Sequence, residues 1–403
     1  STGVTGCEIW GVYIISSYID GIKFNGDTNT VRGCWISGAG RPVGWSTNSN
    51  ASFSGQGLGF HGYNDITIEE NVFENNGAYL QYDHHLYGAG KRIKVRGNVF
   101  RNGIAWGLQA YDSVIDNDQW EIAHNLIYGN GVPGVSASGL TFWTLGNVTN
   151  YIYGNTIIAP SGHYGVIINQ ANTSARLYFS NNIVEGDGAY GVLYAYGAGG
   201  TNSVKSDYNL LSSFVSGEPR GANDVAGSAT FDSTANGRYW LTTASAGRSM
   251  AAPAICNPKD FFGRAQSTVS DVGAFQYEAS LEADSRDLTD TQRDYWVREP
   301  GGLLVSRSGT SHLLSWTEQN QHHTSYEIQR KDSVNNTYAL MATISRGTLT
   351  YSDSGAKTNG VTYTYSMAPV TSLGNGGGIA TTPTVTQLYN AVNAQIAFKR
   401  FRF

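Results

Sequence analysis

The sequence predicts an all-β fold that consists of a parallel β-helix followed by a small β-sandwich. Three observations support this class. The 403 residues include 50 glycines and 25 tyrosines but only 14% charged residues, which favours short strands and tight turns over long surface helices. An asparagine followed two positions later by an apolar residue recurs through residues 1–278. Segments with alternating apolar residues then recur after residue 300.

The repeat has a period close to 27 residues. Its asparagines are Asn71, Asn98, Asn125, Asn155, Asn182 and Asn209, with steps of 27, 27, 30, 27 and 27 residues. This period, with β-branched runs between turns, fits one coil of a parallel β-helix, in which coils stack about 4.8 Å apart. We expect each side-chain amide to bond the equivalent amide one coil away, which forms an asparagine ladder. Upstream, Cys34 and Cys7 continue the series and are expected to stack in the ladder as two thiols.

Residues 1–278 resemble the right-handed parallel β-helix superfamily of pectate lyases and other polysaccharide lyases. The segments DFFGR at 260–264 and DVGAFQY at 271–277 look like the closing signature of many secreted bacterial members. The resemblance implies a catalytic β-helix in a secreted or cell-surface protein whose partner is a polysaccharide substrate.

The chain after the repeat has a different character. Residues 279–300 are charged and irregular, which predicts a linker or a capping segment. Over 301–388, the segments LLSW at 313–316 and YEIQR at 326–330 resemble a fibronectin type III module, which is usually a spacer in such enzymes. Residues 389–403 form a tail that fits either an extra strand or the stub of a longer protein.

Composition and spacing exclude several classes. The formal net charge of −5 provides no basic surface for nucleic acid, and no apolar run is long enough to span a membrane. The sequence gives no indication of the oligomeric state. No cofactor is expected; Asp112, Asp116 and Asp118 are the best candidates for Ca²⁺, but they fit a turn better. A zinc site from the histidines at 61 and 84–85 would need further ligands that the sequence does not place.

Outward side chains on one face form two columns if the strands that begin with Gly and an apolar residue share that face. The first column then reads Lys23, His61, Tyr87, Gln109, Thr141, Ile167 and Leu193. The second reads Asn25, Tyr63, Ala89, Tyr111, Trp143, Asn169 and Ala195. His85 replaces the leading glycine and is expected to face outward, although a shift of one residue would turn His84 outward instead.

An insertion falls close to the first column. The step from Cys34 to Asn71 is 37 residues, and the excess lies in the segment 38–55, which is rich in Gly, Ser and Asn. This loop, with Arg41, is expected to wall one end of a groove beside His61.

These residues suit β-elimination from a uronic acid. That reaction needs groups that neutralise the carboxylate, a base that takes the C5 proton and an acid for the leaving oxygen. We assign His85 as base, Tyr87 as acid, and Gln109 with Lys91 as the carboxylate clamp. The predicted catalytic residues are His61, His85, Tyr87 and Lys91; the predicted substrate-binding residues are Lys23, Arg41, Asp83, Gln109, Tyr111 and Trp143, of which the last two offer platforms for sugar rings.

Three alternatives stay open at the level of the sequence. A β-helix glycoside hydrolase would use two carboxylates; FHG at 60–62 and RIK at 92–94 are similar to polygalacturonase motifs, but the accompanying Asp pair is missing. A C5-epimerase shares the proton abstraction and returns the proton. A non-catalytic carbohydrate-binding or adhesive protein needs only the surface.

Overall fold

The computed structural model describes residues 5–17, 19–40, 55–77, 83–131, 138–144, 146, 148–170, 173–186, 192–198, 200–213, 218–234, 237–251, 260–261, 270–275, 277, 301–308, 311–317, 325–335, 337–345, 347–355, 358, 361–371, 374–375, 380–381 and 385–386. The chain divides into two compact units, Ser1–Ser285 and Arg286–Phe403. The predicted linker or cap at 279–300 and the tail at 389–403 lie outside the described residues, as do residues 41–54 of the insertion.

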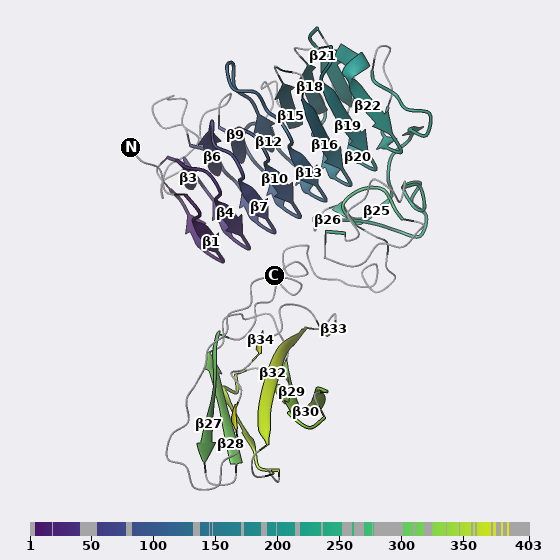
Figure 1. Ribbon diagram of the computed structural model, residues 1–403. Helices are drawn as coiled ribbons and strands as arrows, with labels where there is room; N and C mark the ends of the chain where they lie inside the picture. Colours follow the sequence, from purple (N-terminus) through teal and green to yellow (C-terminus); the bar gives the residue numbers. More distant parts are fainter. Residues whose placement is uncertain are drawn as a thin grey trace. The chain divides into compact units, whose positions relative to one another are not determined.

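The first unit is a right-handed parallel β-helix with three sheets along its axis, which confirms the predicted fold class (Figure 1). Sheet A contains β1 (Glu8–Trp10), β4 (Thr30–Arg32), β7 (Thr67–Glu69), β10 (Lys94–Arg96), β13 (Glu121–Ala123), β16 (Thr149–Tyr153), β19 (Arg176–Ser180) and β22 (Val204–Asp207). Sheet B contains β2 (Tyr13–Ile15), β5 (Trp35–Ser37), β8 (Val72–Glu74), β11 (Val99–Arg101), β14 (Leu126–Tyr128), β17 (Thr156–Ile158), β20 (Ile183–Glu185), β23 (Leu210–Leu211) and β24 (Val225–Ala226). Sheet C contains β3 (Ile22–Phe24), β6 (Leu58–His61), β9 (Leu86–Ala89), β12 (Leu108–Ala110), β15 (Ser138–Thr144), β18 (Tyr164–Gln170) and β21 (Leu193–Tyr196); a short 3₁₀ turn, η2 (Gly200–Ser203), follows.

Because the strands pair in parallel from coil to coil, side chains of the same kind stack on one another. Val95 of β10 pairs with Ile68 of β7 and Ile122 of β13, and all three are fully buried. Phe100 of β11 pairs with Phe73 of β8, and their rings stack with centroids 4.8 Å apart. Since burial of one such side chain contributes about 1.5–3 kcal/mol, the stacked interior is the main source of stability for this unit.

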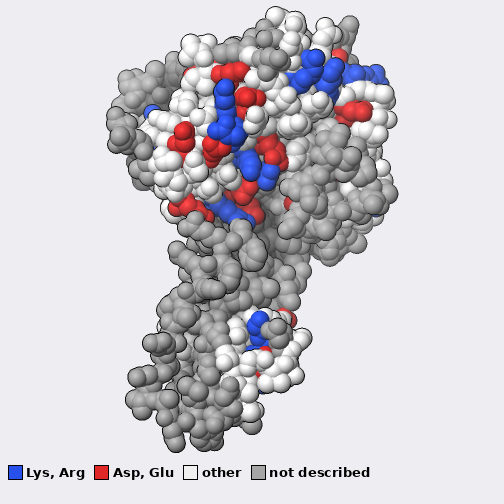
Figure 2. All heavy atoms as spheres, in the orientation of Figure 1, with Lys and Arg blue, Asp and Glu red and all other residues white. Residues whose placement is uncertain are grey.

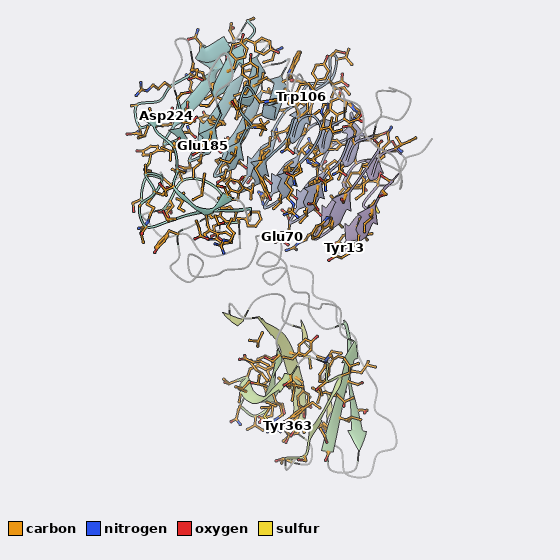
Figure 3. All side chains as sticks on the ribbon, turned by 180° about the vertical axis from the view of Figure 1, so that it is seen from behind. Tyr13, Glu70, Trp106, Glu185, Asp224 and Tyr363 are labelled. Atoms are coloured by element: carbon orange, nitrogen blue, oxygen red, sulfur yellow. The ribbon has the colours of Figure 1, made fainter. Side chains whose placement is uncertain are left out.

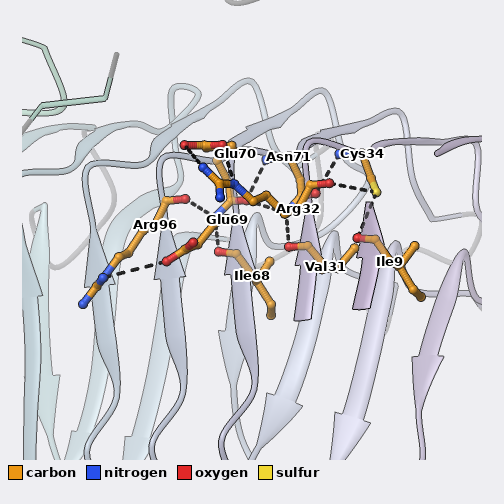
Figure 4. Close-up of polar contacts among 10 residues, drawn as sticks. Ile9, Val31, Arg32, Cys34, Ile68, Glu69, Glu70, Asn71 and Arg96 are labelled. Carbon is orange, nitrogen blue, oxygen red and sulfur yellow. Dashed lines mark hydrogen bonds and ion pairs between the residues drawn. The ribbon is translucent and has the colours of Figure 1, made fainter. Parts of the chain in front are cut away.

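A column of buried asparagines lines the turn from sheet A to sheet B, and Figure 4 shows its first member, Asn71. The side-chain amide of each donates to Oδ1 of the next at 2.9–3.0 Å, through Asn71, Asn98, Asn125, Asn155, Asn182 and Asn209. Asn98 Oδ1 also accepts the backbone N–H of Asn71, and its Nδ2 donates to the carbonyl of Ile68. The residue before each asparagine has a left-handed backbone, as in Glu70 with φ 56°. The column thus satisfies the polar backbone that a tight turn buries.

Cys34 takes the asparagine position one coil earlier, but Cys7 does not continue the column. The N–H of Cys34, before β5 in sheet B, donates to Oδ1 of Asn71 at 2.9 Å. Cys7 precedes β1 in sheet A and donates its N–H to Asn29. The expected stacking of the two cysteines is wrong because the first coil steps by 22 residues, which places Val12 opposite Cys34. Among the described residues, neither cysteine forms a disulfide.

The later coils of sheet B are covered by the end of the first unit. The hairpin of β25 (Phe231–Ser233) and β26 (Arg238–Leu241) packs Tyr239 against Tyr128 of β14, with ring centroids 4.6 Å apart. The N–H of Ala229 donates to Glu185, which lies at the opposite end of the β-helix from Tyr13 (Figure 3). Sheet B therefore offers little outward surface in these coils.

The outward side of sheet A carries paired charges in its early coils (Figures 2 and 4). Arg32 donates to both carboxylate oxygens of Glu70, at 2.8 and 3.1 Å. Arg96 forms ion pairs with Glu69 on one side and Glu121 on the other. Burial raises the pKa of Glu69 and would also raise that of Glu121, but hydrogen bonds from Arg96 and then Tyr153 outweigh it and lower the Glu121 pKa. These charges mostly neutralise one another.

The second unit is the predicted β-sandwich. One sheet orders β27 (Gly301–Ser308), β28 (Ser311–Thr317) and β31 (Thr350–Asp353). The other orders β30 (Ala339–Ser345), β29 (Ser325–Asp332), β32 (Thr362–Thr371) and β33 (Gly374–Asn375), with β34 (Ala380–Thr381) and β35 (Val385–Thr386) also paired to β32. Trp316 and Tyr326 meet edge to face in the core, with ring centroids 5.8 Å apart. Tyr365 and Arg330 both donate to the buried carboxylate of Asp353 at 2.7 Å.

Removal of one asparagine from the column should destabilise the β-helix without a large change in core volume. We expect Asn98→Ala to lower the free energy of unfolding by about 2–4 kcal/mol, because the N–H and amide of Asn71 and the carbonyl of Ile68 lose buried partners. Chemical denaturation followed by circular dichroism measures the loss. The exposed control Lys94→Ala should stay within about 0.5 kcal/mol of wild type. Equal stability of Asn98→Ala and wild type would show that the column is dispensable.

Candidate functional site

Sheet C presents two outward columns of side chains that the strand register defines. The first contains Lys23, Gly59, Tyr87, Gln109, Thr141, Ile167 and Tyr194. The second contains His61, Ala89, Tyr111, Trp143, Asn169 and Tyr196. The predicted columns are correct over the middle coils, from β9 to β18.

Two corrections apply toward the ends of these columns. Gly59, and not His61, pairs with Tyr87, so His61 belongs to the second column. At the other end, Leu193 is buried, and its neighbour Tyr194 takes the outward position. Turn lengths differ between coils, and a count from the leading Gly-apolar pair therefore slips by one or two residues.

His85 is fully buried, and the expectation that it faces outward as the catalytic base is wrong. Its Nδ1 lies 2.9 Å from Nδ2 of Asn76, and its Nε2 lies 2.9 Å from Oδ1 of Asn130. Asn76 can only donate through Nδ2, so Nδ1 accepts and the ring proton sits on Nε2, which donates to Asn130. The ring also lies beside Phe73 and Phe100 in the core. His85 is a structural residue.

The reason lies in a second asparagine column, in the turn from sheet B to sheet C. Asn76 and Asn130 occupy this column, and Gly103 stands midway between them. A Cβ on Gly103 would lie 2.6 Å from Nε2 of His85, so the glycine makes room for the imidazole. His85 thus fills the missing rung. The spacing 76, 103, 130 is the sequence signal that could have identified its role.

Asp83 and His84 are also buried. The predicted contact of Asp83 with substrate is wrong, since its side chain is fully shielded from solvent. His84 packs against Trp106 and Tyr87, with ring centroids 4.6 and 5.3 Å away. Burial, and then the neighbouring His85, lower the pKa of His84 to about 3, so its ring is neutral. Trp106 lies in the middle coils in Figure 3.

His61, Asp112 and Tyr87 form a cluster of side chains that can transfer protons on the outward side of sheet C. Nδ1 of His61 lies 3.4 Å from Oδ2 of Asp112, and 38% of the His61 side chain is exposed. The other carboxylate oxygen of Asp112 accepts the N–H groups of Val114 and Ile115, which fixes the carboxylate. The His61 ring meets Tyr87 edge to face, with centroids 4.6 Å apart. Because Asp112 lies at Nδ1 of His61, it orients the imidazole ring and leaves Nε2 as the nitrogen that can accept a proton from a substrate.

Tyr87 is held in its protonated form. Burial, and then the charges of Tyr111 and Asp112, raise its pKa to about 12. A phenol with this pKa can donate a proton throughout the neutral and mildly alkaline range. His61 and Tyr87 thus combine a proton acceptor with a proton donor on one surface.

Aromatic side chains continue from this group along sheet C. Tyr111 stacks on Tyr87 with centroids 6.5 Å apart and meets Trp143 edge to face at 4.5 Å. Trp143 then meets Tyr196, at 6.0 Å. We call His61, Tyr87, Tyr111, Trp143 and Tyr196 the aromatic stripe. Such rings present apolar faces with polar edges, which suits the C–H faces and hydroxyls of sugars.

The remaining predicted site residues take varied places. Gln109 lies beside Tyr87 in the first column and is 9% exposed. Lys23 is at the early end of this column, where its ammonium lies 3.8 Å from Asp20. Lys91 is exposed in the turn after β9, two residues beyond Ala89, and bridges to Asp118 through the backbone. Arg41 lies outside the described residues.

Two aspartates of the acidic segment 112–118 accept hydrogen bonds from neighbouring groups. Asp112 is engaged as above, and Asp116 accepts from Thr144 Oγ1 and the N–H of Gly146. No group of three His, Cys, Asp or Glu side chains suited to a metal occurs in the described part of the chain. In that same part, no helix has the length and apolarity to cross a membrane.

Comparisons with known proteins give likeness in structure alone. No family model matches the chain, and no curated protein matches it in sequence. The structure is similar to pectate lyase Pel9A, with 14% identity over 66% of this chain and 70% of that chain and a TM-score of 0.40. It is also similar to an FN3 domain of human collagen XX, with 25% identity over 22% of this chain and 94% of that domain and a TM-score of 0.19. A further match is an Fn3-like protein from Clostridium thermocellum, with 23% identity over 23% of this chain and 95% of that chain and a TM-score of 0.18.

Truncation of His85 should affect stability far more than truncation of His61. We expect His85→Ala to lower the free energy of unfolding by about 2–4 kcal/mol, because it leaves a cavity and strips Asn76 and Asn130 of a partner. His61→Ala, at a half-buried surface position outside the core, should change it by less than about 0.5 kcal/mol. Chemical denaturation of both variants checks this. A stable His85→Ala chain would place that ring outside the core.

Proposed function

We propose that the protein is a secreted enzyme that cleaves an acidic, uronic acid-containing polysaccharide by β-elimination. The observation that carries the proposal is the half-buried pair of His61 and Tyr87, with Asp112 beside Nδ1 of His61, at the head of the aromatic stripe. The resemblance of the β-helix to pectate lyases agrees with this choice. The β-sandwich unit is proposed to be a spacer.

The proposed reaction uses the residues of this surface in order. The polysaccharide lies along sheet C, with sugar rings against Tyr111 and Trp143. Nε2 of His61 takes the C5 proton while Asp112 stabilises the imidazolium that forms. The side-chain amide of Gln109 donates to the substrate carboxylate as negative charge builds on it. The C4–O bond then breaks, a C4–C5 double bond forms, and Tyr87 gives its proton to the leaving oxygen. His61 returns a proton to Tyr87.

Hydrolysis of a glycoside has less support on this surface. It would need two carboxylates with separate acid and base roles. Of the described acidic residues near the stripe, Asp112 has one oxygen bound by backbone N–H groups, and Asp83 is buried. Epimerisation at C5 would use the same base, and product analysis must separate it from elimination.

Incubation with pectate, alginate and glycosaminoglycans tests the proposal directly. We expect the ultraviolet absorbance of an unsaturated uronate to grow with one of these substrates. New reducing ends without this absorbance would indicate a hydrolase. Deuterium uptake at C5 without cleavage would indicate an epimerase, and binding with neither change would indicate a carbohydrate-binding protein.

Loss of the Tyr87 hydroxyl should affect turnover and leave binding in place. We expect Tyr87→Phe to lower kcat by about 10²–10⁴-fold with a small change in KM, because the ring stays and the proton donor is lost. Steady-state kinetics on the active substrate measure this. Tyr194→Phe removes a hydroxyl from the same column and is the control, with expected activity close to wild type. Equal losses in both variants would count against Tyr87 as the acid.

The pKa of Tyr87 also sets an expectation for pH dependence. A general acid acts while it is protonated, so its contribution persists below its pKa and disappears above it. Because that pKa is about 12, Tyr87 should cause no fall in kcat between about pH 8 and 10. A pH–kcat profile of wild type against Tyr87→Phe checks this. A descending limb near pH 9 that Tyr87→Phe removes would contradict it.

A further inference from the structure

We infer that the outward side of sheet A, in its later coils, holds a second carbohydrate-binding site, specific for an acidic oligosaccharide. Tyr151 of β16 and Tyr178 of β19 pair in register, and their rings stack with centroids 5.3 Å apart and planes 12° apart. They remain 42% and 38% exposed. Large rings left this open on a strand surface form an apolar platform beside water. Binding here does not depend on turnover at sheet C.

A hollow with an unsatisfied hydroxyl adjoins this platform. The hollow has a volume of about 280 Å³ and is lined by Tyr178, Ser180, Lys205, Ser206 and Asp207. Ser180 is 2% exposed, and its Oγ has no hydrogen-bond partner among the described residues. Buried polar atoms in native proteins are almost always paired. A sugar hydroxyl or carboxylate in the hollow would supply the missing partner.

The charge next to the platform is basic. Lys205 of β22 pairs in register with Tyr178 of β19. Arg176 lies two residues before Tyr178 on β19. Within the described part of the chain, neither forms an ion pair with a carboxylate; Arg176 donates to the carbonyls of Thr173 and Ala175. Figure 2 shows basic side chains over this end of the β-helix, with acidic side chains beside them. Arg32 and Arg96, in the early coils of the same sheet, are instead bound to glutamates.

These features select the ligand. The paired tyrosine rings suit the C–H face of a pyranose. The Ser180 hydroxyl in the hollow can bond a polar group of the sugar. Lys205 and Arg176, which form no ion pair with a carboxylate of the described residues, favour a sugar that carries a carboxylate. Asp207 on the rim stays negatively charged, and its oxygens accept the backbone N–H and side-chain amide of Asn223. Because Lys205 and Arg176 carry two positive charges against this one, the three side chains have a net charge of +1. The rival explanation is a cross-strand aromatic pair that only stabilises the sheet.

Calorimetric titration of the full chain with oligogalacturonate and oligoalginate separates the explanations. The background carries Tyr87→Phe, to prevent turnover, and Trp143→Ala, to weaken binding at sheet C. We expect one acidic oligosaccharide to bind this background. Adding Tyr178→Ala should weaken that binding by at least about tenfold, whereas Tyr178→Phe should retain it. Lys205→Gln should weaken it and reduce its dependence on salt. Neutral cello-oligosaccharides are the ligand control.

The inference fails if Tyr178→Ala binds the acidic oligosaccharides as tightly as Tyr178→Phe. It also fails if no acidic oligosaccharide binds the background, or if Tyr178→Ala changes only the melting temperature. The test is independent of the proposed function, because Tyr178→Ala in the otherwise wild-type chain should keep its kcat on short substrates. A chain without lyase activity can still bind at sheet A, and an active lyase can lack this site.

Discussion

The hydrogen bonds of the buried asparagine column constrain the rest of the β-helix. Each side-chain amide ties one coil to the next, so the coils stay in register at the turn between sheets A and B. Because register is fixed there, the side chains of sheets A and C also align in columns from coil to coil. A surface that recognises a polymer needs this alignment, since its contacts must repeat along one direction. The same bonds that satisfy a buried turn therefore place the aromatic stripe.

His85 shows how the same constraint can imitate a catalytic residue. In sequence, Asp83, His84, His85 and Tyr87 suggest a proton-handling cluster, yet the structure turns three of them inward and leaves Tyr87 in the stripe. The imidazole of His85 replaces an asparagine amide in the second column, because one ring nitrogen accepts a hydrogen bond from Asn76 and the other donates one to Asn130. Proton-transfer groups and buried hydrogen-bond bridges need the same chemistry, and only exposure to solvent separates them.

The fold was predictable from the sequence because the residues that repeat, the asparagines and the apolar residues after them, are buried. The period near 27 and the apolar residue after each asparagine are enough to define the coils and the middle of both columns on sheet C. Prediction failed where coil length changes. The step of 22 in the first coil displaced Cys7, and unequal turns displaced His61 by two positions. The contact of Asp112 with His61 joins residues on different coils across a turn, and no local pattern marks it.

In the proposed mechanism His61, and not His85, meets the substrate. Ring-nitrogen NMR of the histidines, with and without an acidic oligosaccharide, distinguishes the two residues. We expect His85 to keep its proton on Nε2, to exchange it slowly with solvent and to be unchanged by the ligand, while the His61 signals shift. A shift of the His85 signals on binding, with those of His61 unchanged, would contradict it.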